Sequence, residues 1–385
     1  MDLTSKLPNS NTSIFAVMTA LATKHNAINL AQGFPDYPIS GRLMDLVYEK
    51  MKGGFNQYAP MPGLLTLRES IASKLDHLYQ LPINVQDEIT VVAGATQGIF
   101  TSIQALVGRG DEVIIFEPAY DSYIPSIKLA GAIAVPIALE GPNFSIDWDF
   151  VASKINDRTK LILINTPHNP SGTILIQEDW NRLYDLIKGK SIMVLSDEVY
   201  EHLVFENQRH VSLLQQSWWR DHGLAVYSFG KTLHATGWKL GYIIAPSFIS
   251  KEIRKVHQFE VFSCNTPIQA AIAEYILDSK VYSGLPSFFQ EKRDYLNEQI
   301  AGSLFHIYKS AGTYFTLVDY RDISNKKDTE FAKDLVEKYG IATIPLSVFY
   351  TNPVENQTLI RLCFAKEITT LKAASEILNQ VKSEL

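Results

Sequence analysis

The chain has 385 residues, of which 46% are hydrophobic and 20% are charged, so it can bury a large core and is long enough for two or three domains. Its formal net charge of −6 argues against a nucleic-acid-binding protein, because neutralising phosphates requires concentrated basic surface. The two cysteines, Cys264 and Cys363, have no metal-ligand spacing and fit a reducing compartment, so neither a metal site nor a disulfide is expected.

Residues 1–45 contain many turn signals, among them the segment QGFPDYP. We expect them to form an arm that joins a smaller domain farther along the chain. The first 25 residues lack the basic start and the cleavage site of a secretory signal, and their only apolar stretch is short and interrupted. We therefore expect a cytoplasmic protein without a membrane partner.

Residues 46–281 are expected to form a large domain. Between residues 94 and 246, short β-rich runs alternate with segments of helical periodicity such as TQGIFTSIQALVG and QEDWNRLYDLIKG. This alternation predicts an α/β fold in which a mostly parallel sheet is flanked by helices on both faces. Such sheets bind ligands outside the carboxyl ends of their strands, and Asn169, Asp197 and Lys231 each follow an apolar run.

Residues 282–385 show a different pattern and are expected to form a smaller α+β domain. The pattern predicts a charged amphipathic helix at residues 288–303, strands near TYFTLVDY and LIRLCFA, and helices at residues 329–340 and 373–385. No repeat or low-complexity tract separates the parts, so only this change of pattern sets the boundaries.

Lys231 and Asp197 together indicate pyridoxal phosphate as the cofactor. Enzymes that use it need a lysine that forms a Schiff base with the cofactor aldehyde, and a carboxylate that keeps the pyridine nitrogen protonated. Lys231 follows one apolar strand in SFGKT, and Asp197 follows another in LSDEVY, where an uncompensated carboxylate would be costly. Taken singly, such a lysine is more often an exposed side chain, and such an aspartate serves equally well as a helix N-cap.

Two segments could hold the phosphate of this cofactor. Ser228 lies three residues before Lys231, and Lys239 follows in TGWKLGY, which places a hydroxyl and a second cation near the lysine. The segment VAGATQ is a strand followed by a small-residue turn and a helix, and a helix N-terminus offers free N–H groups to a phosphate. The expected phosphate contacts are Gly94, Ala95, Thr96, Ser228 and Lys239.

Four other side chains could contact the cofactor ring or the substrate. Tyr200 and Asn169 suit hydrogen bonds to the ring hydroxyl oxygen, and Tyr120 could stack on the ring or be an ordinary half-buried aromatic. Arg361, a lone arginine in the apolar run TLIRLCFA, could clamp the α-carboxylate of an amino acid. It could equally face outward on an edge strand, because the alternating pattern does not fix its face.

Taken in order, these motifs resemble those of the class I and II aminotransferases of fold type I over nearly the whole chain. The segments SFGKTLHATGWKLGY, KVHQFEVFSCNTPIQAA and GTYFTLVDY look most like the branch that holds bacterial methionine aminotransferase, kynurenine aminotransferase and glutamine transaminase K. The resemblance implies the pyridoxal phosphate-dependent transferase fold and an enzyme that moves amino groups between amino acids and 2-oxo acids. It also gives Lys231, Asp197 and Tyr200 the catalytic roles, in agreement with the interpretation of the residues themselves.

The resemblance further implies a homodimer whose active sites lie at the interface. Tyr58 would reach the phosphate of the neighbouring subunit, and Gly33 would make a backbone contact to the substrate carboxylate. Many members of the family carry arginine where this chain has Lys239. A side-chain pocket for the substrate is expected near Thr96 and Ser263, and its candidate apolar walls are Phe15, Phe34, Tyr37 and Phe262.

We expect the chain to transaminate an apolar, aromatic or sulfur-containing amino acid, methionine first, by a ping-pong mechanism, since no second cation for a distal carboxylate is evident. The alternatives are a kynurenine- or glutamine-type transaminase and a cysteine-conjugate β-lyase, whose early steps are shared. A non-enzymatic ligand sensor would need a DNA-binding head and a basic surface, and this acidic sequence offers neither.

Overall fold

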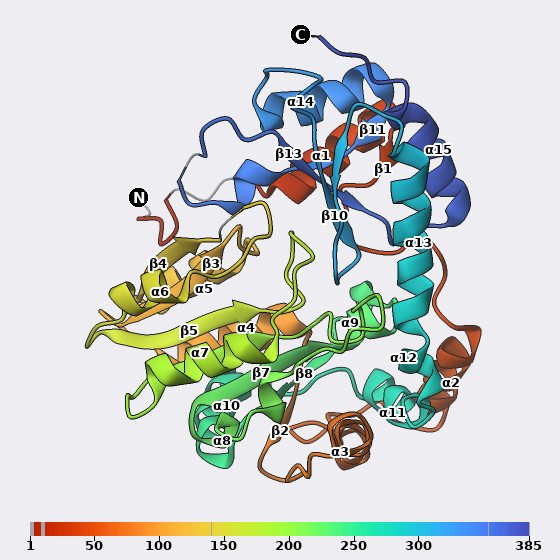
Figure 1. Ribbon diagram of the computed structural model, residues 1–385. Coiled ribbons are helices and arrows are strands. Elements are labelled where there is room, and N and C mark those ends of the chain that lie inside the picture. The colour runs from red at the N-terminus through yellow and green to blue at the C-terminus, as the bar shows by residue number, and fades with distance from the viewer. Residues whose placement is uncertain (1–3, 9–11, 140, 353, 385) are drawn as a thin grey trace.

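The computed structural model describes residues 4–8, 12–139, 141–352 and 354–384. A seven-stranded sheet lies at the centre of the larger part, with the strand order β2-β8-β7-β6-β5-β3-β4 (Figure 1). Five of these strands are parallel, and β8 runs antiparallel to its neighbours β2 and β7. The strands are β2 (Ile89–Val92), β3 (Glu112–Glu117), β4 (Ile133–Ala138), β5 (Thr159–Asn165), β6 (Met193–Asp197), β7 (Gly223–Ser228) and β8 (Gly241–Ile244).

Helices cover both faces of this sheet, which explains why its central strands are nearly continuous apolar runs. In β3, Val113 and Ile115 pack on one face while Ile114 between them packs on the other. The first face is covered by α4 (Ala95–Leu106), α5 (Tyr123–Leu129) and α10 (Ser247–Glu260). The second is covered by α3 (Leu65–Tyr79), α6 (Trp148–Lys154), α7 (Gln177–Ile187), α8 (Trp219–His222) and α11 (Thr266–Tyr275).

Short elements connect the sheet to its surroundings. The helix α2 (Gly41–Lys52) packs against α11, and the single turn α9 (Phe229–Thr232) follows β7 directly. The remaining pieces are α12 (Lys280–Ser283) and the 3-10 turns η1 (Leu213–Gln215), η2 (Thr236–Trp238) and η4 (Leu346–Phe349).

The smaller part is built on an antiparallel sheet with the order β12-β13-β10-β9. Its strands are β9 (His306–Tyr308), β10 (Phe315–Asp319), β12 (Ile344–Pro345) and β13 (Leu359–Cys363). It carries the helices α13 (Leu285–Ile300), α14 (Asp328–Asp334) with the π-turn η3 (Leu335–Tyr339), and α15 (Ile368–Leu378). The α/β fold with a mostly parallel sheet and a smaller α+β part is confirmed.

The N-terminal segment joins the smaller part, where the red α1 lies among the blue C-terminal elements in Figure 1. It contains a helix that was not predicted, α1 (Ile14–His25), whose first turn is capped by Ser13 Oγ accepting from the N–H of Ala16 at 3.3 Å. Next, β1 (Ile28–Asn29) pairs in parallel with β11 (Ile341–Ala342). The domain boundaries remain predictions, since α2 begins inside residues 1–45 and α12 spans the boundary at residues 281 and 282.

The last helix differs from the prediction of residues 373–385. It begins earlier because Asp36, far away in the sequence, caps its start, accepting from Glu367 N at 2.6 Å and from Thr370 Oγ1 at 2.7 Å. It ends at Leu378, and residue 385 lies outside the described residues. Among the helices of the described ranges, none combines the length and apolar character needed to cross a membrane.

Candidate active site

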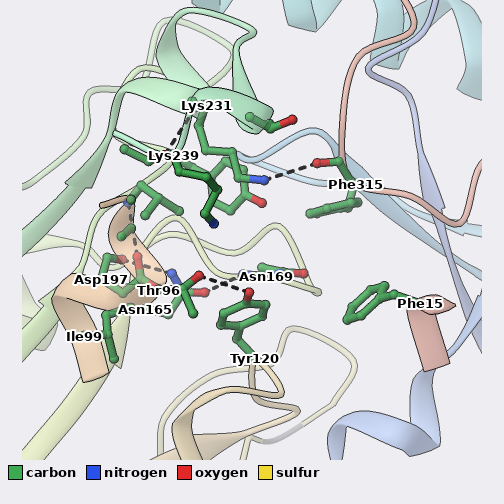
Figure 2. Close-up of a pocket in the computed structure, with 18 of the residues that line it drawn as sticks. Phe15, Thr96, Ile99, Tyr120, Asn165, Asn169, Asp197, Lys231, Lys239 and Phe315 are labelled. Atoms are coloured by element: carbon green, nitrogen blue, oxygen red, sulfur yellow. Dashed lines mark hydrogen bonds between the residues drawn. The ribbon is translucent and has the colours of Figure 1, made fainter. Parts of the chain in front are cut away.

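A cavity of about 310 Å³ lies between the carboxyl ends of the central strands and the smaller sheet (Figure 2). Most of the predicted site residues line it, and they come from all parts of the chain. These residues are Gly33, Gly94, Ala95, Thr96, Tyr120, Asn169, Asp197, Tyr200, Ser228, Lys231, Lys239 and Arg361. Tyr58 and Phe262 are the exceptions.

Lys231 lies on α9, whose start is capped by Ser228 Oγ, which accepts from Lys231 N at 3.4 Å. The amine points into the cavity, where Nζ lies 2.7 Å from the Tyr314 hydroxyl and 3.1 Å from the Gly33 carbonyl oxygen. Burial, reinforced by the nearby charge of Arg361, lowers the pKa of Lys231 to about 8. An amine of this pKa can exist in its neutral, proton-accepting form near physiological pH.

Asp197 ends β6 as a buried carboxylate. Its Oδ2 accepts a hydrogen bond from the Tyr123 hydroxyl at 2.5 Å, and its Oδ1 accepts from Val199 N at 3.3 Å. Burial raises the pKa of Asp197 to about 6, although these hydrogen bonds and Lys231 oppose the shift. No helix in the described part of the chain begins at Asp197, so the N-cap alternative does not hold.

Asn165 and Tyr123 belong to this site and were not predicted. Asn165 pairs in register with Asp197 across β5 and β6, donates from Nδ2 to the Asp197 carbonyl at 2.9 Å, and accepts from Asn169 N at 2.7 Å. Tyr123 comes three residues after Tyr120 and begins α5, and the two rings meet edge to face with centroids 5.6 Å apart. That spacing in the sequence was a signal for a second site tyrosine.

The turn before α4 forms a cradle beside Lys239. Gly94 has φ +84, a conformation that favours glycine, and a Cβ built on it would lie 3.4 Å from Lys239 Cε. A Cβ on Gly241 would meet the Tyr227 carbonyl oxygen at 2.4 Å and Ala95 N at 3.1 Å, so the two segments approach closely only because side chains are absent. The start of α4, Ser228 and Lys239 thus face one end of the cavity, as a phosphate requires.

Arg361 lies on β13, an inner strand of the small sheet, and is 1% exposed, so the edge-strand alternative is wrong. Its Nη1 donates to Asn169 Oδ1 at 2.8 Å and its Nη2 donates to the Ala31 carbonyl at 3.0 Å, while Nε has no partner among the described residues. The guanidinium lies 3.8 Å from the centroid of the Phe315 ring, which was not predicted as a site residue. A buried cation with an unused donor and no carboxylate paired to it in the described chain is suited to an anionic ligand.

The tyrosines of the cavity differ in their surroundings. Tyr200 is buried, meets Tyr314 edge to face at 5.1 Å between centroids, and has its pKa raised by burial. Tyr120 lies beside the start of α4, with its hydroxyl 3.4 Å from Thr96 Oγ1 (Figure 2). Tyr314 does not appear among the predicted residues, because it sits in the smaller part and reaches Lys231 only through the tertiary fold.

Tyr58 and Phe262 lie on the surface of this chain, 83% and 45% exposed. Their rings meet edge to face with centroids 5.5 Å apart. Of the candidate apolar walls, Phe15 lines the cavity, whereas Phe34 is 43% exposed and Tyr37 packs against His234 and Phe288.

The donor set of the cavity fits pyridoxal phosphate. A buried carboxylate of raised pKa needs a cationic N–H partner, which a pyridinium supplies, and the glycine-lined cradle beside Lys239 has the shape and charge for a phosphate. The Lys231 amine lies in the same cavity as both groups.

Comparisons with known proteins agree with this geometry. The model of the family Aminotransferase class I and II matches residues 25–378. Methionine aminotransferase of Escherichia coli (strain K12) is 48% identical over 378 residues, which cover 98% of this chain and 98% of that protein. Human kynurenine–oxoglutarate transaminase 1 is 33% identical over 399 residues, covering 95% of this chain and 94% of that one.

Solved structures extend the likeness to three dimensions. The crystal structure of YbdL from Escherichia coli, for which a methionine aminotransferase function was identified, matches with a TM-score of 0.97 at 48% identity and covers 99% of this chain and 100% of that one. N-succinyldiaminopimelate aminotransferase from Mycobacterium tuberculosis matches with a TM-score of 0.94 at 33% identity, with coverage of 99% and 100%.

Proposed function

This chain belongs to the class I and II aminotransferase family, and from that membership we propose that it moves the amino group of methionine to a 2-oxo acid in two half-reactions. It is a pyridoxal phosphate-dependent transaminase of amino acids and 2-oxo acids. The observation that supports methionine as the amino donor is the 48% identity to Escherichia coli methionine aminotransferase over 98% of both chains. Other apolar, sulfur-containing and aromatic amino acids are the further candidates.

Each end of the cofactor has a set of residues that would hold it. When bound, pyridoxal phosphate supplies an electron-withdrawing ring that lowers the barrier to losing a proton from the substrate Cα. Asp197 would hold the pyridine nitrogen protonated, and Tyr200 and Asn169 would donate hydrogen bonds to the ring hydroxyl oxygen. Tyr120 would stack on the ring, and the phosphate would be held by Gly94, Ala95, Thr96, Ser228 and Lys239.

Lys231 is proposed as both the covalent anchor and the proton carrier. A lysine of pKa about 8 is a stronger base than a carboxylate and is neutral in a useful fraction of molecules near pH 7 to 8. Its amine would take the Cα proton of the amino acid and later return it.

Arg361 is proposed to bind the α-carboxylate of the substrate, with the backbone of Gly33 and the amide of Asn169 beside it. The hydrogen bond from Arg361 to Asn169 holds the guanidinium in place, and its buried Nε has no partner among the described residues. The cations among the described lining residues are Lys231, Lys239 and Arg361, and each has a role already. A distal carboxylate would therefore lack a cationic partner among the described lining residues of this chain, which favours apolar side chains such as that of methionine over aspartate.

We also propose that the active unit is a homodimer. Tyr58 and Phe262 support it, because these large side chains are exposed on this chain and Tyr58 is the residue proposed to reach the partner's phosphate. Phe259, three residues before Phe262 in the sequence, is 86% exposed. A cytoplasmic location is proposed from the two buried cysteines, Cys264 and Cys363, which are unpaired and suit a reducing compartment.

A donor panel tests the proposed substrate. The purified enzyme with pyridoxal phosphate is incubated with one 2-oxo acid acceptor and, in turn, methionine, phenylalanine, kynurenine, glutamine or aspartate, and the new 2-oxo acid is quantified by mass spectrometry. Methionine should give the highest kcat/KM and aspartate the lowest. A preference for aspartate, or for kynurenine by tenfold over methionine, would refute the proposed donor.

A further inference from the structure

Three distant parts of the chain meet at the amine of Lys231. The lysine comes from α9, which follows β7 of the central sheet. Tyr314 lies directly before β10 of the smaller sheet, and Gly33 belongs to the N-terminal segment. Lys231 Nζ lies 2.7 Å from Tyr314 Oη and 3.1 Å from the Gly33 carbonyl oxygen, and the Tyr314 hydroxyl donates to the same carbonyl at 2.5 Å. In Figure 2 the Lys231 side chain extends across the cavity toward Phe315.

The direction of these hydrogen bonds determines which protonation state of Lys231 they favour. Because the hydroxyl hydrogen of Tyr314 is given to the Gly33 carbonyl, the Tyr314 oxygen faces Lys231 as an acceptor. Both contacts to the amine are therefore acceptors of N–H groups. An ammonium has three such groups and no lone pair, so this pair of acceptors favours the protonated lysine.

The two acceptors are held firmly in place. A Cβ on Gly33 would lie 2.8 Å from Phe315 Cζ, so the carbonyl reaches the lysine only because residue 33 has no side chain. The N-terminal segment is tied to β13 by the hydrogen bonds from Cys363 N to the Leu30 carbonyl at 2.9 Å and from Arg361 to Ala31. Tyr314 is 1% exposed, and its carbonyl accepts from Phe364 N at 3.0 Å.

We propose that Tyr314 is a positioning residue that, together with the Gly33 carbonyl, forms a dock for the Lys231 amine while it carries a proton. The inference rests on the proposed role of Lys231 as the proton carrier. When the amine takes the substrate Cα proton it becomes an ammonium, of which two N–H groups bond to the dock. The third N–H group makes no bond to the dock, so its proton is free to be returned. Gly33 is also proposed to contact the substrate carboxylate through its backbone. The dock therefore links the position of the N-terminal segment to the protonation state of Lys231.

The test compares Tyr314→Phe with Tyr320→Phe. Tyr320 is the matched control, because it is also buried, lies at the other end of β10, and donates from its hydroxyl to the Lys326 carbonyl at 2.8 Å without contacting a lysine amine. Trace acetylation with acetic anhydride from pH 6 to 10, followed by peptide mass spectrometry, gives the pKa of Lys231 in the cofactor-free full-length chain and in the enzyme loaded with the amine form of the cofactor. Both are states in which the lysine amine is free.

Tyr314→Phe removes an acceptor of the ammonium, so the midpoint of Lys231 acetylation should fall by about one pH unit and kcat for methionine about tenfold, at unchanged KM. Tyr320→Phe should leave both values as in the wild type. An unchanged or raised midpoint in Tyr314→Phe would overturn the dock. Should Tyr314→Phe not fold, Gly33→Ala, which must displace the carbonyl, should lower the midpoint in the same direction, and an unchanged midpoint there would overturn the dock as well.

The labelling separates this inference from the proposed function. A shifted midpoint in a chain that converts no amino donor would leave the dock standing and refute the proposed reaction. If the enzyme converts methionine but the variants keep the wild-type midpoint of Lys231 acetylation, the reaction is supported and the dock is refuted.

Discussion

Arg361 on β13 donates a hydrogen bond at 2.8 Å to Oδ1 of Asn169, which follows β5 of the central sheet. This bond joins the smaller sheet to the larger one across the cavity. It orients a guanidinium that is packed on the Phe315 ring and has no carboxylate partner in the described chain. The substrate α-carboxylate would then complete an ion pair that the protein itself leaves open.

Arg361→Ala should lower kcat/KM for methionine about 30- to 1000-fold, mainly through KM, because a buried, hydrogen-bonded charge pair is lost. Arg361→Lys should recover only part of this, since an ammonium cannot form the two-pronged contact. Steady-state kinetics measures both. Arg321→Ala is the matched control in the smaller part, because Arg321 is an exposed arginine paired with Asp319, and it should stay within twofold of wild type. Equal losses in Arg361→Ala and Arg321→Ala would contradict the proposed carboxylate contact.

Cofactor affinity should depend on pH through Asp197. Its raised pKa means that the carboxylate is ionised above about pH 6 and protonated below it, and only the ionised form stabilises a pyridinium. Binding of pyridoxal phosphate to the cofactor-free protein, followed by fluorescence, should therefore weaken as the pH falls through about 6. Tyr123→Phe removes a hydrogen bond that lowers this pKa, so the weakening should begin at a pH higher by about half to one unit.

The control for this titration is Tyr184→Phe, since Tyr184 stacks on Trp218 far from the cavity and should leave the profile unchanged. A wild-type profile that is flat between pH 5 and 8, or one in which Tyr123→Phe moves the loss to lower pH, would show that Asp197 does not govern cofactor binding.

Breaking the buried ion pair between Lys74 and Glu201 should destabilise the protein. Lys74 on α3 bonds to the Glu201 carboxylate, and both side chains are nearly inaccessible. Although burial alone would raise it, Lys74 and His202 bring the pKa of Glu201 far below its ordinary value. Lys74→Met should lower the free energy of unfolding by about 3–5 kcal/mol at pH 7, because it leaves a buried charge unpaired.

The pH dependence of this loss has a definite sign. A carboxyl with a lowered folded-state pKa stabilises the protein above its unfolded pKa, so the difference between wild type and Lys74→Met should shrink as the medium is acidified. Urea unfolding at several pH values measures it. The double variant Lys74→Met/Glu201→Leu should regain most of the loss at pH 7, and a double variant as unstable as the single one would contradict an electrostatic origin.

The sequence was informative about the site residues that directly follow the ends of strands. Asn169, Asp197 and Lys231 were placed together because the carboxyl ends of parallel strands meet at one edge of a sheet, and the structure brings all three to one cavity. The face of Arg361 could not be predicted, since a period-two pattern does not show which face of a strand is buried. It became definite only in the folded chain, where the side chain is 1% exposed and packs on the Phe315 ring.

The residues that were missed depend on tertiary contacts. Tyr314 and Phe315 read as ordinary core residues of a small strand, and their proximity to Lys231 and Arg361 arises from the packing of one sheet against the other. The early start of α15 has the same cause, because its cap, Asp36, comes from a segment more than 300 residues earlier in the chain.

The visible spectrum of the enzyme loaded with pyridoxal phosphate, recorded before and after adding methionine without any 2-oxo acid, tests the proposed reaction most directly. We predict that the absorbance band of the bound aldehyde form converts to that of the amine form, that the 2-oxo acid of methionine appears in equal amount, and that Lys231→Ala does neither. An unchanged band after methionine, or turnover by Lys231→Ala equal to that of wild type, would contradict the account.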